Sequence, residues 1–334
     1  MITDARVLDT DFVPSDILHR HDELNALSQS LALPLEQHYG DRSYVFGPSG
    51  SGKTCLARYL LHTLRETHPK ISTQYINAWH HHAPFAFLFQ LVDGVGPTHD
   101  IDERSTSHDE LLNRVRERDE ELYVVVIDEA DQLDDPQLLY HLNRMAHLHL
   151  IFVANQEEQF FATLDDRLFS RLSVGERVHL DRYSDDEIQA ILERRATAGL
   201  ELNVAPAPIR EQIAALADGD ARCAIEMLKV AARTARAAGH TQITTGDVIQ
   251  AETTARENLR QKTVSKLTRH QRVLYEILQA ADEPVPMGTV SEEYRHRVSN
   301  PKTRQTLRRY LKKLASYNLV TIEGATSGRT YAAV

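Results

Sequence analysis

Residues 47–54, which read Gly-Pro-Ser-Gly-Ser-Gly-Lys-Thr, have the types and spacing of a phosphate-binding loop. They follow a short apolar run at 44–46 and precede an amphipathic run that begins at Leu56, so the predicted order is strand, glycine-rich loop, helix. The glycines allow backbone N–H groups to turn toward phosphate oxygens, and the start of the helix adds partial positive charge. Lys53 would neutralise the phosphates, and the Thr54 hydroxyl would complete an Mg²⁺ shell. The loop therefore predicts a site for a nucleotide with Mg²⁺.

A second group of polar residues follows a predicted buried strand. Residues 122–127 are an unbroken run of apolar, largely β-branched residues, which is typical of a strand buried on both faces of a parallel sheet. Asp128 and Glu129 come directly after it, at the end of a strand where open α/β sheets bind ligands. We expect Asp128 to contact the Mg²⁺ shell and Glu129 to polarise an attacking water. A chance acidic strand end is the alternative.

Four more polar residues are candidates for sensing the nucleotide. Asn155 follows the predicted strand at 148–154, where it can hold the lytic water or contact the γ-phosphate. Arg167 or Arg171 is expected to reach a neighbouring subunit's nucleotide as an arginine finger, with a surface salt bridge as the alternative for each. Arg222 lies in the first turn of a predicted helix, where its charge opposes the helix dipole. That small cost favours a ligand-facing role.

Composition and charge limit the class of protein. The 334 residues are enough for two or three domains, and no apolar run is long enough to span a membrane. The N-terminus lacks the pattern of a signal peptide, and two cysteines give no disulfide framework, so we predict a cytosolic protein with no membrane partner. The net charge of −10 is uneven, because residues 266–334 hold 12 Lys and Arg against 6 Asp and Glu. A basic end on an acidic chain suggests a localised contact with a polyanion.

The elements around these candidates divide the chain further. Residues 184–256 are alanine-rich and predicted to be helical, with Ser184 and Glu187 as a capping box at their start. The polar stretch 256–265 is expected to be a linker. Helices are predicted at 269–280, 290–298 and 302–317, and strands at 319–323 and 329–333, with a turn at 324–328 between the strands.

The last predicted helix, 302–317, has a basic face. Three helices followed by a hairpin make a winged helix-turn-helix, which places its third helix in the major groove of duplex DNA. A solvated basic face without a partner is the alternative. The candidate DNA-binding residues are Arg304, Arg308, Arg309, Lys312 and Lys313 on this helix, and Arg329 beside the hairpin.

Over nearly its full length the chain resembles the archaeal origin-recognition initiators, a clade of AAA+ ATPases related to the eukaryotic origin-recognition and helicase-loading proteins. The matching motifs run in the same order along the chain. They are Val13-Pro14 with His19-Arg20, the loop at 47–54, Tyr75-Ile76-Asn77, Asp128 to Asp131, Asn155, Arg167 with Ser170-Arg171, Tyr183 with Ile191-Leu192 and Arg195, Gly219 to Arg222, and the C-terminal winged helix.

The resemblance implies an α/β fold with three domains: an AAA+ parallel-sheet core at 1–180, a helical lid at 181–258 and a winged helix at 265–334. It implies ATP or ADP with Mg²⁺ as cofactors. Lys53 and Thr54 take the Walker A role, Asp128 and Glu129 the Walker B role, Asn155 and Arg222 the two sensor roles, and Arg171 or Arg167 the finger. The remaining nucleotide-binding candidates are Val13, Pro14, Gly50, Ser51, Gly52, Cys55 and Tyr183. From the residues alone, Val13 and Pro14 either cover the adenine or belong to an ordinary leading segment.

The chain departs from the family pattern at one place. The family has an extra helix between the first two ATPase motifs that also touches origin DNA, and the equivalent here is expected near residues 84–96. Residues 71–103 contain no lysine or arginine. A DNA contact by this helix is therefore not predicted from charge, although apolar wedges also act in minor grooves.

Together with the motifs, the resemblance implies an ATP-switched initiator that hydrolyses ATP slowly, binds duplex origin DNA and recruits the replicative helicase. Self-association, or association with paralogous initiators on DNA, is expected as well. One alternative is a transcriptional regulator that uses the nucleotide as a structural ligand. Another is a clamp-loader-like ATPase that acts in a ring.

Overall fold

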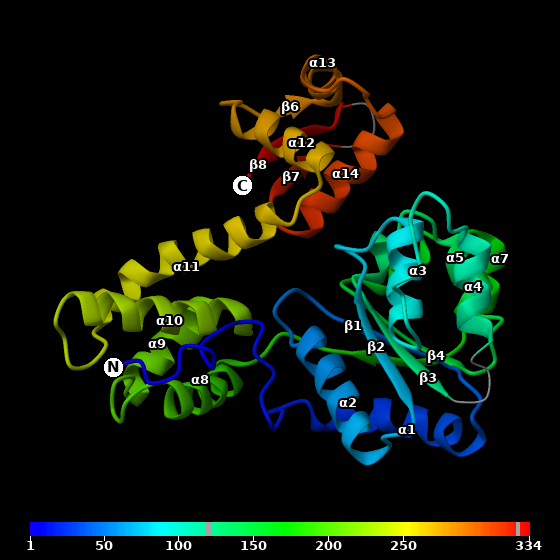
Figure 1. The fold of residues 1–334 in the computed structure, drawn as a ribbon. Coiled ribbons are helices and arrows are strands. Elements are labelled where there is room, and N and C mark those ends of the chain that lie inside the picture. Colours follow the sequence, from blue (N-terminus) through cyan, green and yellow to red (C-terminus); the bar gives the residue numbers. More distant parts are fainter. Residues whose placement is uncertain (118–121, 325–327) are drawn as a thin grey trace. The chain divides into compact units, whose positions relative to one another are not determined.

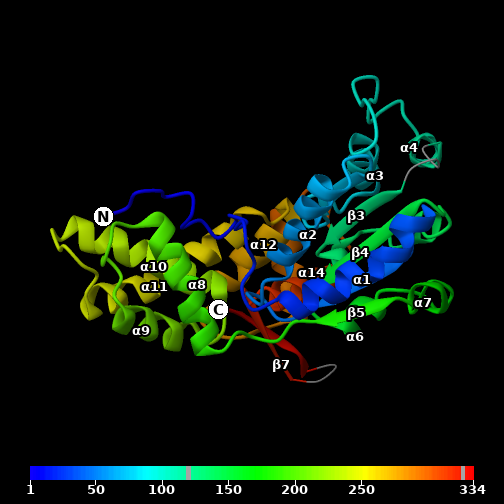
Figure 2. The ribbon, with the colours of Figure 1, turned by 90° about the horizontal axis from the view of Figure 1, so that it is seen from below.

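The structure, a computed structural model, describes residues 1–117, 122–324 and 328–334. It divides into two compact units, Met1–Thr253 and Thr254–Val334. Figure 1 labels most of the helices and strands of both units, and Figure 2 labels β5 and α6.

A five-stranded parallel sheet forms the centre of the first unit. Its strands lie in the order β2-β3-β4-β1-β5, and each neighbouring pair is parallel. The predicted parallel sheet is therefore confirmed, and β3 is buried along its whole length as its sequence indicated. β5 was not predicted, because only one of its four residues is buried and it has no apolar pattern. The strands are β1 (Arg42–Phe46), β2 (Ser72–Asn77), β3 (Tyr123–Asp128), β4 (Leu148–Ala154) and β5 (Glu176–His179).

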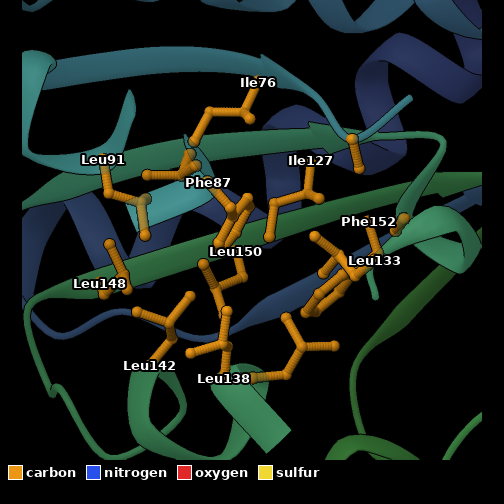
Figure 3. Close-up of a cluster of buried hydrophobic side chains, with 14 of the residues drawn as sticks. Ile76, Phe87, Leu91, Ile127, Leu133, Leu138, Leu142, Leu148, Leu150 and Phe152 are labelled. Carbon is orange, nitrogen blue, oxygen red and sulfur yellow. The ribbon is translucent and has the colours of Figure 1, made fainter. Parts of the chain in front are cut away.

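Helices cover both faces of this sheet (Figure 1). Alternate residues of a strand point to opposite faces, so Val124 and Val126 of β3 pack with α1 and α2, whereas Val125 and Ile127 belong to the opposite cluster. Figure 3 shows that second cluster, where Phe87 and other apolar side chains of the flanking helices meet the strands. The helices are α1 (His21–Gln37) and α2 (Lys53–Thr67) on the first face, and α3 (Pro84–Asp93), α4 (His108–Arg116), η1 (Ala130–Gln132), α5 (Gln137–Leu142), α6 (Glu157–Phe161) and α7 (Asp166–Leu172) on the other.

A helical bundle completes the first unit. It contains α8 (Asp185–Gly199), α9 (Ala207–Ala217) and α10 (Ala221–Ala237), which pack against one another (Figure 2). The predicted capping box at the start of α8 is confirmed, because the Ser184 N–H donates to Glu187 Oε2 at 2.8 Å and the Glu187 N–H donates to Ser184 Oγ at 3.3 Å. We call these three helices the lid helices.

The expected linker at 256–265 is wrong, since these residues form the second half of the helix α11 (Thr245–Ser265). Residues 247–265 contain no glycine or proline and are rich in strong helix formers, which explains why the helix continues through a polar stretch. Within the described ranges of the chain, none of the helices combines the length and apolar character that crossing a membrane requires.

After the second half of α11, the described residues of the second unit form three further helices and a small antiparallel sheet with strand order β6-β8-β7. Its core includes Leu274, Leu307, Leu311 and Tyr331. The expected order of helices and hairpin is confirmed, but β6 was not predicted, and residues 325–327 of the expected turn lie outside the described residues. The second helix begins three residues earlier than expected. The elements are α12 (Arg269–Gln279), β6 (Val285–Pro286), α13 (Met287–Arg297), α14 (Arg304–Ser316), β7 (Val320–Glu323) and β8 (Thr330–Ala333).

Candidate functional site

The glycine-rich loop between β1 and α2 has a backbone that only glycine adopts easily at two positions. Gly50 has a φ of +80° and Gly52 a φ of +94°, both in the left-handed region. A Cβ atom on Gly50 would lie 2.2 Å from the Asp220 carboxyl group, and one on Gly52 would lie 2.4 Å from the Tyr183 hydroxyl. The loop is thus closely enclosed by Tyr183, which precedes α8, and by Asp220, which precedes α10.

Lys53 is nearly buried inside this loop. Its Nζ atom donates to the carbonyl oxygens of Gly47 at 2.7 Å and Pro48 at 2.8 Å. Burial lowers the pKa of Lys53 to about 8, and the Glu129 and Asp128 carboxylates act in the opposite direction. The ammonium group is held inside the loop by two backbone carbonyl oxygens, and its charge is incompletely solvated there.

Asp128, at the end of β3, is held by three donors. Its Oδ2 atom accepts hydrogen bonds from the Thr54 hydroxyl at 2.7 Å and from the Tyr75 hydroxyl at 2.6 Å. Its Oδ1 atom accepts from the N–H of Glu129 at 2.9 Å, and Glu129 itself has a left-handed φ of 55°. A non-glycine residue in that conformation costs free energy and often marks a functional position. The structure therefore joins the two predicted Walker motifs by a direct contact between Thr54 and Asp128.

The register of the sheet brings the ends of three strands together. Phe46 of β1 pairs with Ala154 of β4, and Asp128 of β3 pairs with Val153. Asn155 is half-buried and comes directly after Ala154. It therefore lies at the edge of the sheet that also carries the glycine-rich loop and the Asp128 carboxylate.

The first turn of α10 contacts the loop directly. Arg222 Nη2 donates to the Ser49 hydroxyl, and the N–H of Ala221 donates to the carbonyl oxygen of Gly50 at 3.2 Å. Asp220 caps the helix by accepting from the N–H of Cys223 at 3.0 Å. The prediction that Arg222 lies in a first helical turn is confirmed, and the contact places that turn on the loop.

The N-terminal segment adds a residue that was not among the candidates. The buried Arg20 donates from Nε to the Ser51 carbonyl oxygen at 3.1 Å and from Nη2 to that of Asp181 at 2.6 Å. Its guanidinium lies 4.0 Å from the ring centroid of Tyr183. Arg20 was quoted only within the family motif, because nothing in the local spacing connects it to a loop thirty residues later.

Four of the nucleotide-binding candidates lie near this N-terminal segment or the loop. Val13 and Pro14 are half-buried, and Arg195 of α8 donates to the carbonyl oxygen of the preceding Phe12 at 3.0 Å. Burial raises the pKa of both Cys55 and Tyr183, so both side chains stay neutral. A role for Val13 and Pro14 over the adenine, and for Cys55 and Tyr183 in nucleotide binding, stays a prediction.

The two arginine-finger candidates lie on α7 and contact Tyr140 of α5. The guanidinium of Arg167 is 4.6 Å from the ring centroid of Tyr140 and that of Arg171 is 5.1 Å from it. Arg167 Nη2 also donates to the Tyr140 hydroxyl at 2.8 Å. Burial acts to raise the pKa of Tyr140, but the charges of Arg167, Arg171 and Arg144 lower it below its usual value. Both arginines are exposed and lie at Tyr140, and a contact with a neighbouring subunit's nucleotide stays a prediction.

The chemistry of the loop fits a nucleotide and Mg²⁺. The Ser51 Oγ atom is buried and has no hydrogen-bond partner in the described part of the chain, which leaves an orphaned donor within the loop. The described residues contain no group of three or more His, Cys, Asp or Glu that could hold a metal ion alone. A hydroxyl and one carboxylate, as in Thr54 and Asp128, match the way Mg²⁺ is usually bound together with substrate phosphates.

The six candidate DNA-binding residues of the second unit divide into two groups. Arg308, Arg309, Lys312 and Arg329 line one pocket between α14 and the β7–β8 hairpin, together with Ile322 and Tyr331. The other two candidates are placed differently. The Arg304 guanidinium lies beside Gly288 at the start of α13, and Lys313 is only half-exposed.

Comparison with known proteins gives consistent matches. A family model described as an AAA domain matches residues 38–160, and one described as a Cdc6 AAA+ ATPase-type lid domain matches residues 189–253. The chain is 38% identical to ORC1-type DNA replication protein 9 of Halobacterium salinarum, over 100% of this chain and 94% of that protein. It is 42% identical to ORC1-type DNA replication protein 1 of the same organism, over 92% of this chain and 100% of that protein.

Solved structures show the same fold. The Aeropyrum pernix ORC1 protein, solved in complex with DNA, has a TM-score of 0.78 at 24% identity and covers 99% of this chain and 93% of its own. Cdc6p from Pyrobaculum aerophilum has a TM-score of 0.68 at 21% identity, covering 100% and 94%. At this identity the structures support the fold alone. The two Halobacterium relatives decide the family: the chain belongs to the archaeal ORC1/Cdc6-type DNA replication proteins, a family of AAA+ ATPases.

Proposed function

We propose that this replication protein is an initiator that binds duplex origin DNA under the control of bound ATP or ADP. The observation that carries the proposal is the convergence of two separate segments, β3 and the first turn of α10, on the glycine-rich loop that holds Lys53. Lys53 lies inside the loop, the Asp128 carboxylate reaches Thr54 at its end, and Arg222 of the lid helices contacts Ser49 at its start.

Each group would act on a different part of the nucleotide. Lys53 would bind the phosphate oxygens, and Thr54 with Asp128 would hold Mg²⁺, which neutralises phosphate charge when it is bound. Glu129 would accept a proton from, or orient, the attacking water, with Asn155 beside it. Hydrolysis at such a site is expected to be slow and to serve as a switch.

The lid helices are the means by which the switch would be read. Because Arg222 and Ala221 contact the loop through one helical turn, a γ-phosphate in the loop would compete for the Arg222 guanidinium now bonded to Ser49. ATP and ADP would therefore leave the first turn of α10 in different positions. A finger role for Arg171 or Arg167 would add a contact to a neighbouring subunit's nucleotide.

The basic pocket on the second unit supports contact with duplex DNA. Arg308, Arg309, Lys312 and Arg329 gather at the junction of helix α14 and the hairpin, where winged helices meet the double helix. The proposal also includes recruitment of the replicative helicase and association with further copies or paralogues on DNA. It includes a cytoplasmic location as well. The family resemblance supports these three parts.

The test is to map the genomic sites that the protein occupies in cells, in the wild type and in a Lys53→Ala variant. Occupancy at replication origins that depends on Lys53 is the expected result. Binding confined to gene promoters would contradict the proposal and favour a transcriptional regulator.

A further inference from the structure

The Tyr75 hydroxyl contacts the Asp128 carboxylate, although Tyr75, quoted only within a family motif, was given no role from the sequence. Tyr75 lies on β2, and its hydroxyl donates to Asp128 Oδ2 at 2.6 Å, the same oxygen that accepts from Thr54 at 2.7 Å. Asp128 is 3% exposed. Its Oδ2 atom is therefore occupied by two side-chain hydroxyl groups in an environment with little water.

The Asp128 carboxylate keeps one acceptor position that the described residues do not fill. An ionised carboxylate has about four lone-pair positions. Tyr75 and Thr54 take both positions on Oδ2, and the N–H of Glu129 takes one on Oδ1. One position on Oδ1 then remains, and the rotation of the carboxylate about its bond to Cβ is fixed by donors on both sides.

The Tyr75 ring is itself held by a residue of α2. The Arg58 guanidinium lies 4.4 Å from the ring centroid of Tyr75. Arg58 follows Thr54 by one helical turn, so both residues lie on one face of α2. Helix α2 thus contacts both partners of the hydrogen bond between Tyr75 and Asp128. Thr54 contacts the carboxylate, and Arg58 contacts the ring.

We propose that Tyr75 is a positioning residue for magnesium binding, because it fixes the Asp128 carboxylate in the orientation that Mg²⁺ bound with the nucleotide requires. This inference rests on the proposed function, since it assumes that Thr54 and Asp128 serve a magnesium ion. Residues that orient a metal-binding carboxylate typically change metal affinity by about 10–100-fold when they are replaced.

The experiment measures ADP binding by isothermal titration to the full chain, first in EDTA and then over a series of Mg²⁺ concentrations. Tyr75→Phe keeps the ring over which Arg58 lies and removes only the hydroxyl. We expect it to raise, by about tenfold, the Mg²⁺ concentration at which half of the Mg²⁺-dependent increase in ADP affinity is reached. The ADP affinity in EDTA should stay within about twofold of the wild type.

Tyr123→Phe is the matched control. Tyr123 is a buried tyrosine of the neighbouring strand whose hydroxyl donates to the Leu91 carbonyl oxygen at 2.9 Å, and it lies at the opposite end of β3 from Asp128. It should leave the Mg²⁺ dependence unchanged. Arg58→Gln provides a second variant should Tyr75→Phe fold poorly, with an expected shift in the same direction of about two- to fivefold, as for loss of a cation–π contact.

The outcomes separate the inference from the function on which it rests. If Mg²⁺ does not strengthen ADP binding to the wild type, the metal role of Thr54 and Asp128 fails and the inference fails with it. If the wild type responds to Mg²⁺ and Tyr75→Phe responds identically, only the inference is overturned. An equal loss of ADP affinity with and without Mg²⁺ would also overturn it, because it would indicate a purely structural role.

Discussion

Two regions of this protein concentrate positive charge, and they do so in opposite ways. At the glycine-rich loop, Lys53 and Arg20 are buried, and each donates to backbone carbonyl oxygens that fix its position. On the second unit, the arginines and lysine that line the pocket beside α14 are exposed to solvent. One region holds its cations in place before a ligand arrives, and the other presents them to water.

The difference indicates two kinds of anion recognition. A buried cation with fixed partners interacts strongly with one ligand of defined geometry, because the surroundings screen little of its charge. Exposed cations are screened by salt and by water. They suit a long polyanion such as DNA, of which they contact several phosphates at the same time. Arg222 is the intermediate case, since it is exposed yet hydrogen-bonded to the loop.

The largest expected effect is the loss of nucleotide affinity when Lys53 is replaced. Lys53→Ala removes a nearly buried charge from the phosphate site, and we expect ATP and ADP to bind about 100-fold more weakly or worse, equivalent to about 3 kcal/mol. Isothermal titration measures this. Duplex DNA binding in the absence of nucleotide should be unchanged, which is what separates the two basic regions.

Glu129→Gln is the companion variant for Lys53→Ala. It keeps the size of the side chain and removes the carboxylate, so nucleotide binding should remain and turnover should be lost. Wild-type turnover by Glu129→Gln would show that the water-polarising role is assigned to the wrong residue.

The second effect is a dependence of nucleotide binding on pH. Burial lowers the pKa of Lys53 to about 8 in the unliganded protein, and only the protonated ammonium attracts phosphate. The ADP affinity should therefore be constant below about pH 8 and fall about tenfold for each unit above it, or about 30-fold by roughly pH 9.5. Titration of ADP in EDTA measures this without a metal.

Lys53→Arg is the control for the pH effect. The guanidinium stays charged throughout this range, so the slope with pH should disappear even if the affinity itself changes. A wild-type affinity that does not change between pH 7 and about pH 9.5 would mean that Lys53 behaves as an exposed lysine, and the contrast between the two regions would then be lost.

The sequence predicted most of the core because its strongest patterns are local. The buried strands β3 and β4 are unbroken apolar runs, and the loop between β1 and α2 has fixed spacing. The capping box at Ser184 is equally local and is confirmed. Elements without a local pattern were missed, namely the exposed strand β5 and the two-residue strand β6, and the polar half of α11 was mistaken for a linker.

Contacts between distant segments could not be predicted in the same way. Arg20 reaches Ser51 and Asp181, and Tyr75 reaches Asp128, only because the sheet order β2-β3-β4-β1-β5 brings their segments together. Each depends on side-chain direction after folding, which spacing does not encode. Lys53, Thr54, Asp128 and Arg222, which the structure brings to the loop, were singled out from the sequence, and their roles stay predictions. Arg20 and Tyr75, which hold the loop and the Asp128 carboxylate, appeared only within family motifs and were given no role.

The third effect concerns Arg222, the exposed cation that contacts the loop. Arg222→Ala should weaken ATP binding by about tenfold, the value of one charge-assisted hydrogen bond, and change ADP binding much less. Competitive titration of the two nucleotides gives the ratio directly. Ser49→Ala removes the partner with which a γ-phosphate would compete for the guanidinium, so it should shift the ratio in the opposite direction, toward tighter ATP binding. Equal losses for ATP and ADP in Arg222→Ala would contradict a γ-phosphate contact.

The smallest effects are expected on the exposed basic pocket. If Arg308, Arg309, Lys312 and Arg329 each neutralise a phosphate, the logarithm of DNA affinity should fall with the logarithm of salt with a slope of about −3.6, since each phosphate contributes about −0.9. Lys312→Ala should reduce that slope by about 0.9 on any duplex, a change of only about threefold in affinity for each threefold change in salt.

Arg308→Ala tests whether the same pocket also reads sequence. Arginine can donate two hydrogen bonds to a guanine edge, whereas lysine acts as a single charge. Arg308→Ala should therefore lower the preference for a mapped origin duplex over a scrambled one by about fivefold, or about 1 kcal/mol, and Lys312→Ala should not. Arg269→Ala, an exposed arginine of α12 outside the pocket, serves as the control in the same salt series. If Arg308→Ala and Lys312→Ala lost affinity equally on both duplexes, the exposed region would act only as an electrostatic surface, and sequence preference would have to come from another part of the chain.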